Sequence, residues 1–217
     1  MPSRDKILAS IRKSLHPSEG DFARRLSAEA RIAARARGPV PARAAVSGGE
    51  AVVAFVARLK AAGITVAEGA HMSDVPMLAA DYLRANNLPA RLRMGADAEL
   101  AALDWQALEV AHGRAEPADE VSLSKAFAGV AESGTLVLVS GKDNPTTLNF
   151  LPETQIVVVR AGDVVGGYEA AWDRIRAAGA LPRTVNWVSG PSRTADIEQT
   201  IVMGAHGPRR LHVILTS

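Results

Sequence analysis

The chain has 217 residues and no cysteine, with 25 Lys or Arg against 23 Asp or Glu. This length suits one α/β domain with an appendage, and a domain of that size buries about 70% of its unfolded surface. Without cysteine, this sequence has no disulfide, no thiol nucleophile and no cysteine-ligated iron–sulfur cluster. It also lacks an apolar run of about 18 residues and the apolar core of a secretory signal, which predicts a cytoplasmic protein without a membrane span.

Charge is distributed unevenly along the chain. Residues 1–43 contain 10 Lys or Arg and 4 Asp or Glu, which gives +6, and the remaining 15 basic and 19 acidic residues give −4. A basic segment on an acidic body is typical of an interaction segment, with a solvated Arg-rich helix as the alternative. The break at Gly38-Pro-Val-Pro41 predicts a basic helical arm over 1–43 and an α/β domain over 44–217. No basic–aromatic pattern indicates nucleic-acid binding.

The arm and the first half of the body are predicted to alternate between helices and short strands. Apolar spacing predicts a helix over 3–15 and an Ala- and Arg-rich helix over 22–37 with a thin apolar face. Ser47-Gly-Gly-Glu50 fits a capping box for a helix that ends at Gly63. One face of that helix should carry Val52, Val53, Phe55, Val56 and Leu59. Further strands are predicted at 64–67, 90–93 and 108–111, with a helix capped by Asp74 between the first two.

The second half of the chain is richer in β-forming residues. The predicted strands are 121–127, 135–139, 155–159, 185–188 and 211–215. Residues 129–139 predict a local antiparallel pair within a mixed sheet. A helix over 168–178 should turn Tyr168, Ala171, Trp172 and Ile175 inward. Strands that alternate with helices predict a layered α/β domain with a mostly parallel sheet.

Two turns carry polar groups suited to a ligand. In the first, Gly134 permits close backbone approach, and Ser133 and Thr135 offer hydroxyls beside Glu132 that suit a carboxylate or phosphate. A plain hairpin turn is the alternative, and it is the more common use of such a sequence. The second turn, at 140–144, places Lys142 after a predicted buried strand but lacks the spacing of a phosphate-binding P-loop.

A third polar stretch begins at Gly190, and we expect it to precede a short helix. Ser192, Arg193 and Thr194 would then supply a guanidinium and two hydroxyls near a helix start, which suits an anion. In open α/β sheets such loops bind ligands beyond the carboxyl ends of the strands. The sequence therefore predicts a small anionic metabolite at this position.

Two further polar residues near this stretch have competing interpretations. Asp196 would face the ligand with Arg193, or it would complement the dipole of the expected helix. His206 lies in a Gly- and Pro-rich turn and is either an acid–base group or a turn-fixing residue. The five histidines show no ligand spacing, so no metal site is predicted.

Several longer motifs resemble a known family. They are VSGPSRTADIEQT at 188–200, GAHGPRRLHV at 204–213, GVAESGTLVL at 129–138 and LPETQIVVV at 151–159. Together they resemble the signature of the LUD-domain proteins, in the branch of lactate utilisation protein C, over about residues 45–216. Gln155 stands where the family pattern leads us to expect a histidine.

The resemblance implies a fold like that of the NagB, RpiA and CoA-transferase group, which also includes formyltetrahydrofolate cyclo-ligases. It implies a role in oxidising L-lactate to pyruvate beside partner proteins, one of which carries iron–sulfur clusters. It assigns no cofactor and no catalytic residue. We therefore expect a non-redox subunit that binds a small carboxylate or organises its partners, and a homo-oligomer is compatible with this role. The alternatives are a free-standing enzyme on a phosphorylated or nucleotide-bearing metabolite, and a structural adaptor.

Overall fold

The computed structural model describes residues 3–15, 19–197 and 200–217. It divides the chain into two compact units, Met1–Pro39 and Val40–Ser217. No helix among the described residues is long and apolar enough to cross a membrane.

The first unit consists of two helices, α1 (Ser3–Leu15) and α2 (Glu19–Ala34). Their large apolar side chains are exposed, among them Ile7, Leu15 and Phe22. Helices of this length are marginally stable without packing, and the thin apolar face expected from the sequence offers little surface for packing.

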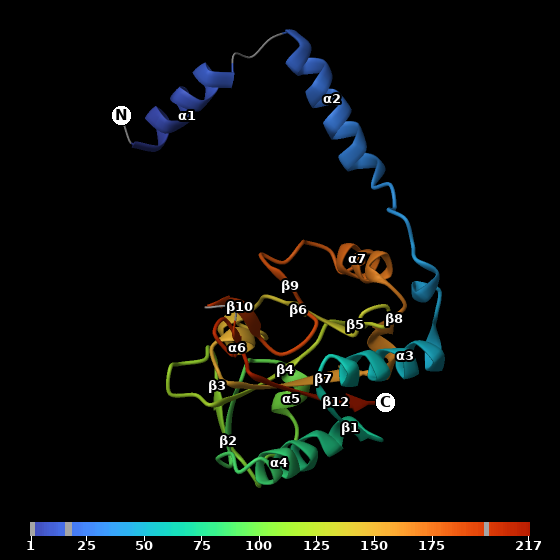
Figure 1. The fold of residues 1–217 in the computed structure, drawn as a ribbon, viewed down its shortest axis with the longest axis vertical. Coiled ribbons are helices and arrows are strands. Elements are labelled where there is room, and N and C mark those ends of the chain that lie inside the picture. The colour runs from blue at the N-terminus through green and yellow to red at the C-terminus, as the bar shows by residue number, and fades with distance from the viewer. Residues whose placement is uncertain (1–2, 16–18, 198–199) are drawn as a thin grey trace. The chain divides into compact units, whose positions relative to one another are not determined.

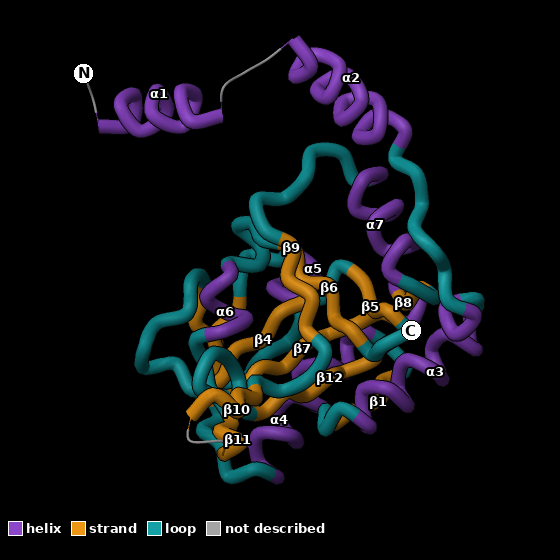
Figure 2. Tube along the Cα trace, turned by 45° about the horizontal axis from the view of Figure 1, so that its top comes forward, coloured by secondary structure: helices purple, strands orange, loops and turns teal. Residues whose placement is uncertain are grey.

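The second unit is built on a six-stranded sheet in which every pair is parallel (Figures 1 and 2). Its strands, in spatial order, are β1 (Thr65–Gly69), β12 (Arg210–Thr216), β7 (Thr154–Arg160), β4 (Val121–Lys125), β2 (Arg91–Met94) and β3 (Glu109–His112). Parallel strands that are covered on both faces are rich in apolar residues along their whole length. The mainly apolar segments 155–159 and 211–215 were predicted as strands for this reason. The predicted layered α/β fold is confirmed.

Each face of this sheet has its own core. Helix α4 (Val75–Ala85) covers one face, where Leu83 packs with Leu123 and Ile156. Helix α3 (Gly48–Ala61) covers the other face, where Phe55 and Leu59 are buried. Figure 1 shows α3 and α4 on opposite sides of β7 and β12.

The predicted face of α3 is only partly correct. Phe55 and Leu59 are buried as expected, but Val53 is 72% exposed, because the helix turns Ala51 inward in its place. Ser47 is the N-cap residue, yet its side chain makes no capping hydrogen bond.

A second, four-stranded sheet lies over α3 and the central sheet. Its strands, in spatial order, are β8 (Val164–Val165), β5 (Ala128–Val130), β6 (Thr135–Val139) and β9 (Val185–Val188). The antiparallel pair of β5 and β6 was predicted within a mixed sheet. It lies in this separate layer, which is mixed because β5 also pairs parallel with β8, and β6 pairs antiparallel with β9. Helix α7 (Tyr168–Ala177) covers the outer face, and its inward residues Ala171 and Ile175 agree with the prediction.

The remaining elements are short. They are the helices α5 (Ala98–Ala101) and α6 (Thr146–Phe150), the 3-10 turns η1 (Ala42–Ala44), η2 (Met72–Asp74) and η3 (Ala161–Asp163), and the strands β10 (Arg193–Ile197) and β11 (Thr200–Met203).

The helix expected after Arg193 is absent, because β10 and β11 pair antiparallel as a hairpin. This segment is rich in Thr, Ile and Val, whose branched side chains favour strands over helices. Without a helix start, the dipole interpretation of Arg193 and Asp196 no longer applies.

Removing residues 1–39 is expected to leave a folded domain with a melting temperature within a few degrees of the parent, because the buried core residues lie at Ala44 and beyond. Removing residues 1–43 should cost about 1 kcal/mol more, because Arg43 pairs with the buried carboxylate of Glu132 at 3.0 Å. Thermal unfolding followed by circular dichroism measures both truncations. An insoluble 1–39 truncation would contradict this division of the chain.

Candidate functional site

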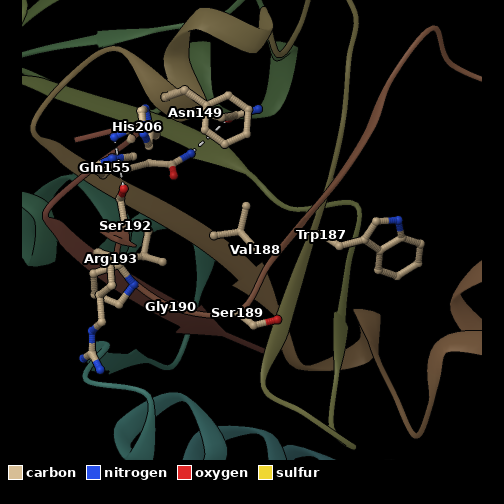
Figure 3. Close-up of a pocket in the computed structure, with 14 residues that line it drawn as sticks. Asn149, Gln155, Trp187, Val188, Ser189, Gly190, Ser192, Arg193 and His206 are labelled. Atoms are coloured by element: carbon tan, nitrogen blue, oxygen red, sulfur yellow. Dashed lines mark hydrogen bonds between the residues drawn. The ribbon is translucent and has the colours of Figure 1, made fainter. Parts of the chain in front are cut away.

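A pocket of about 310 Å³ lies beside the predicted Gly190 loop. The segments 187–193 and 206–208 form its wall, Asn149 and Gln155 lie at its inner side (Figure 3), and Leu211 also lines it. Gln155 is the second residue of β7 and pairs in register with Leu211, the second residue of β12. The pocket therefore lies at the amino-terminal edge of β7 and β12, while its Gly190 loop follows the carboxyl end of β9 (Val185–Val188), the strand after which the sequence interpretation placed it.

Ser192 connects the two loops that form the wall. Its backbone N–H donates to the Pro208 carbonyl at 2.8 Å, and its carbonyl accepts from the Gly204 N–H at 3.0 Å. Its hydroxyl accepts the backbone N–H of His206 at 3.3 Å. Because the hydroxyl oxygen is the acceptor in that bond, its own hydrogen is available to a ligand.

Two fully buried amides form the inner side of the pocket. Gln155 Nε2 donates to Asn149 Oδ1 at 2.9 Å and to Ser124 Oγ at 3.2 Å. Gln155 Oε1 and Asn149 Nδ2 have no hydrogen-bond partner among the described residues. In Figure 3 the side-chain oxygen of Gln155 lies on the side of the amide that faces Ser192 and Val188. Buried polar groups without partners are costly, so the inner side of the pocket carries two unsatisfied amide atoms among the described residues.

Arg193 lines the pocket, but its guanidinium extends toward helix α3. Arg193 Nη2 donates to the carbonyl of Ala62 at 3.3 Å, at the carboxyl end of that helix. A cation at this end complements the helix dipole and satisfies a terminal carbonyl. This contact gives Arg193 a structural role beside the predicted role in anion binding.

A cluster of four hydroxyl groups adjoins the pocket. Thr135 Oγ1 lies 2.7 Å from Ser133 Oγ, 2.8 Å from Tyr168 Oη and 2.6 Å from Ser189 Oγ, and Ser133 Oγ lies 2.9 Å from Tyr168 Oη. Ser189 also lines the pocket, so it links the predicted Ser133-Gly-Thr135 turn to the predicted Gly190 loop.

The other predicted site residues lie outside the pocket lining. Glu132 is paired with Arg43, and Gly134 packs against the backbone of α3. Thr194 belongs to strand β10, opposite Val202.

The remaining two predicted residues are Asp196 and Lys142. The side chain of Asp196 is outside the described part of the structure. Lys142 lies in the loop beside a second cavity of about 240 Å³ that is lined by Lys125, Asp97 and Asn144. The structure thus gathers Gly190, Ser192, Arg193 and His206 around one pocket, and Glu132, Ser133, Gly134, Thr135, Lys142 and Thr194 lie outside its lining.

The sequence interpretation did not select Asn149, Tyr168 or Ser189 as site residues, and it noted Gln155 only as a departure from the family pattern. A polar Gln at the start of an otherwise apolar strand was the signal available for Gln155. No group of three or more metal-ligating side chains occurs in the described parts of the chain.

Comparisons with known proteins identify relatives. The chain is 42% identical over 92 residues to lactate utilization protein C of Bacillus subtilis (strain 168), covering 41% of this chain and 38% of that protein. It is 34% identical over 108 residues to lactate utilization protein C of Geobacillus thermodenitrificans (strain NG80-2), covering 47% and 45%. Each alignment thus spans less than half of the relative's length.

A solved structure and a family model extend the likeness over most of the chain. The crystal structure of a DUF162 family protein from Deinococcus radiodurans superposes with a TM-score of 0.59 at 25% identity, covering 79% of this chain and 99% of that one. The model of the LUD domain matches residues 52–216, a range that includes every residue lining the pocket. This chain therefore belongs to the LUD-domain family.

Proposed function

We propose that this chain takes part in L-lactate utilisation by binding a small carboxylate in the pocket beneath residues 187–193 and 206–208. The observation that carries this proposal is the coincidence of the LUD-domain match with the whole pocket, in a chain whose relatives are named lactate utilization protein C. A volume of about 310 Å³ is at the small end of ligand pockets.

The charge of the pocket supports a monocarboxylate over a phosphate ester. Among the described lining residues, Arg193 is the one side chain with a permanent positive charge, and its guanidinium is shared with the Ala62 carbonyl. Neutral donors such as the Ser192 hydroxyl suit a single carboxylate, whereas phosphate sites use several cations or a set of backbone amides. This argument disfavours the enzyme acting on a phosphorylated metabolite.

The chemistry of the chain supports a partner that transfers the electrons. These 217 residues contain no cysteine, so they offer no thiolate for an iron–sulfur cluster. At position 155 an amide stands in the pocket, and an amide neither takes up nor releases a proton near neutral pH. We propose that this chain binds the carboxylate and that a partner with iron–sulfur clusters oxidises lactate to pyruvate.

The test is growth on L-lactate in a strain that lacks its own copy of this chain. Complementation with Gly207→Val should fail on L-lactate and succeed on pyruvate. A Cβ at Gly207 makes only ordinary contacts, 3.5 Å from Phe150 and Ser192, so the valine side chain fills pocket space without a backbone clash. Gly162→Val is the matched control, because nothing lies within 4 Å of its Cβ position, and it should restore growth. Normal growth on L-lactate with a folded Gly207→Val protein would count against the pocket.

A further inference from the structure

We infer that helix α1 (Ser3–Leu15) binds to an anionic lipid surface and lies along it. The inference is independent of the pocket and of the proposed ligand. It follows from an exposed apolar stripe and from unpaired cations on the same helix.

The apolar side chains of α1 form a stripe along one side of the helix. Ile7, Ile11 and Leu15 recur every four residues, a spacing that places side chains one above another on one face. They are 57%, 48% and 71% exposed, and no residue of α1 is buried. A helix of 13 residues is marginally stable in water. A surface that covers the stripe would therefore stabilise the helix.

Helix α1 also carries positive charge that its own acidic residue does not balance. Its cationic residues are Arg4, Lys6, Arg12 and Lys13. Asp5 is its acidic residue, so four positive charges and one negative charge give +3. None of the four cations forms an ion pair with another residue in the described ranges of the chain. Helix α2 differs, because its three basic and three acidic residues cancel and Arg25 pairs with Glu29 at 2.9 Å.

The cations of α1 lie both beside the stripe and on the opposite side of the helix. Arg4 and Arg12 share a row of the helix surface with Leu8, next to the stripe. Lys6 and Lys13 are seven residues apart and lie on the opposite side. Arginine stems can lie along an apolar surface while their charged ends reach phosphate groups. Charge on several sides of an apolar helix suits a surface whose negative charge is spread over an area, as in a bilayer that contains anionic lipids.

Other modes of binding fit these observations less well. A second copy of α1 would place +3 against +3, and the like charges would repel. An acidic groove on another protein would meet the cations beside the stripe and leave the two lysines on the far side without partners. A helix of this length reaches about 20 Å, which is shorter than the hydrocarbon core of about 30 Å, so α1 would lie along the bilayer and would not span it.

Sedimentation of the full chain with lipid vesicles tests this inference. Vesicles of equal parts phosphatidylglycerol and phosphatidylcholine should carry the chain into the pellet, whereas vesicles of phosphatidylcholine alone should leave it in the supernatant. Added salt should weaken the binding, because it screens the electrostatic attraction. No sedimentation with the anionic vesicles would overturn the inference and favour an acidic protein as the partner of the stripe. Equal sedimentation with both kinds of vesicle would also overturn it, because charge would then play no part.

Ile11→Ser tests the contribution of the stripe. Serine has about the same helix propensity as isoleucine and removes the apolar side chain at the centre of the stripe. The affinity for the anionic vesicles should therefore fall about tenfold. Val53→Ser is the matched control, because Val53 is 72% exposed on helix α3, and it should keep the parent affinity. Unchanged affinity in Ile11→Ser would show that the stripe does not enter the lipid surface and would overturn the inference.

The combined substitutions Arg12→Gln and Lys13→Gln test the contribution of the cations. The affinity for the anionic vesicles should fall about fivefold for each cation removed. The matched control combines Lys60→Gln with Arg114→Gln, which removes two exposed cations of the second unit and should keep the parent affinity. Equal losses in the two double variants would show that binding depends on the net charge of the chain and not on α1, and the inference would fail.

Discussion

Replacing Gly134 with alanine is expected to lower the free energy of unfolding by about 3 kcal/mol or more. Gly134 has a φ of 70°, in the left-handed region that residues with a Cβ rarely adopt. A Cβ built there would lie 2.7 Å from the Cβ of Arg58, 2.9 Å from its carbonyl carbon and 3.0 Å from the Leu59 nitrogen. Two of these atoms belong to the backbone of α3, so helix and turn would have to move apart.

The matched control for this substitution is Gly48→Ala. Gly48 has a φ of 54°, yet nothing lies within 4 Å of its Cβ position, so alanine adds the conformational strain without the clash. We expect a loss of about 1 kcal/mol there. Urea unfolding of the two variants beside the parent separates strain from contact with α3. Equal losses in both variants would show that α3 does not press on the turn.

Strands that are buried on both faces could be predicted from the sequence, because both faces need apolar residues and the strand then appears as an apolar run. Strand β7 of the central sheet and strand β6 of the second sheet contain the apolar runs 156–159 and 136–139, and all of these residues except Val139 are buried. Helix α7 was also predictable, since its inward residues recur at helical spacing. These predictions depend on the spacing of apolar residues within a short stretch of sequence, and that spacing differs between helices and strands.

The arrangement of the second sheet could not be predicted in this way. Its defining contact is the pairing of β6 with β9, in which Leu136 lies opposite Val188. Strands so far apart in the sequence come together through the packing of the whole domain. The sequence of one strand does not indicate which other strand it pairs with. The β10–β11 hairpin was missed for a different reason, because polar residues near Arg193 were given more weight than the β-branched residues around them.

The pocket shows the same division between local and long-range information. Gly190, Ser192 and His206 were predicted because polar residues in Gly- and Pro-containing loops stand out in a sequence, and they line the pocket. Asn149 and Gln155 matter because they contact one another, and each buried amide has one atom without a hydrogen-bond partner among the described residues. That property depends on packing and leaves little trace in either residue's neighbours along the chain.

His212 is predicted to make the stability of the domain depend on pH. Its ring is 4% exposed, stacks on Tyr82 with ring centres 3.9 Å apart, and has Nδ1 2.8 Å from Thr65 Oγ1. Nε2 has no partner among the described residues. Burial disfavours the charged imidazolium, which lowers the pKa of His212 from 6.5 to about 4, and the contact with Thr65 opposes this shift.

The direction of the effect follows from which state binds the proton. Above pH 6.5 the histidine is neutral in both the folded and the unfolded chain. As the pH falls from 6.5 toward 4, the unfolded chain takes up a proton that the folded chain refuses, so the free energy of unfolding decreases. The loss should approach about 3 kcal/mol and level off below the folded pKa.

His212→Phe should remove this part of the pH dependence. Phenylalanine preserves a flat ring against Tyr82 and cannot bind a proton, and the exposed Thr65 hydroxyl returns to water. Urea unfolding at a series of pH values from 4 to 7 should therefore give a flatter profile for His212→Phe than for the parent. His71→Ala, at an exposed histidine, should keep the profile of the parent. Because other groups titrate in the same range, the difference between the two profiles is the quantity that decides. If His212→Phe and the parent lost the same amount of stability as the pH falls, proton uptake by His212 would not be the cause of that loss.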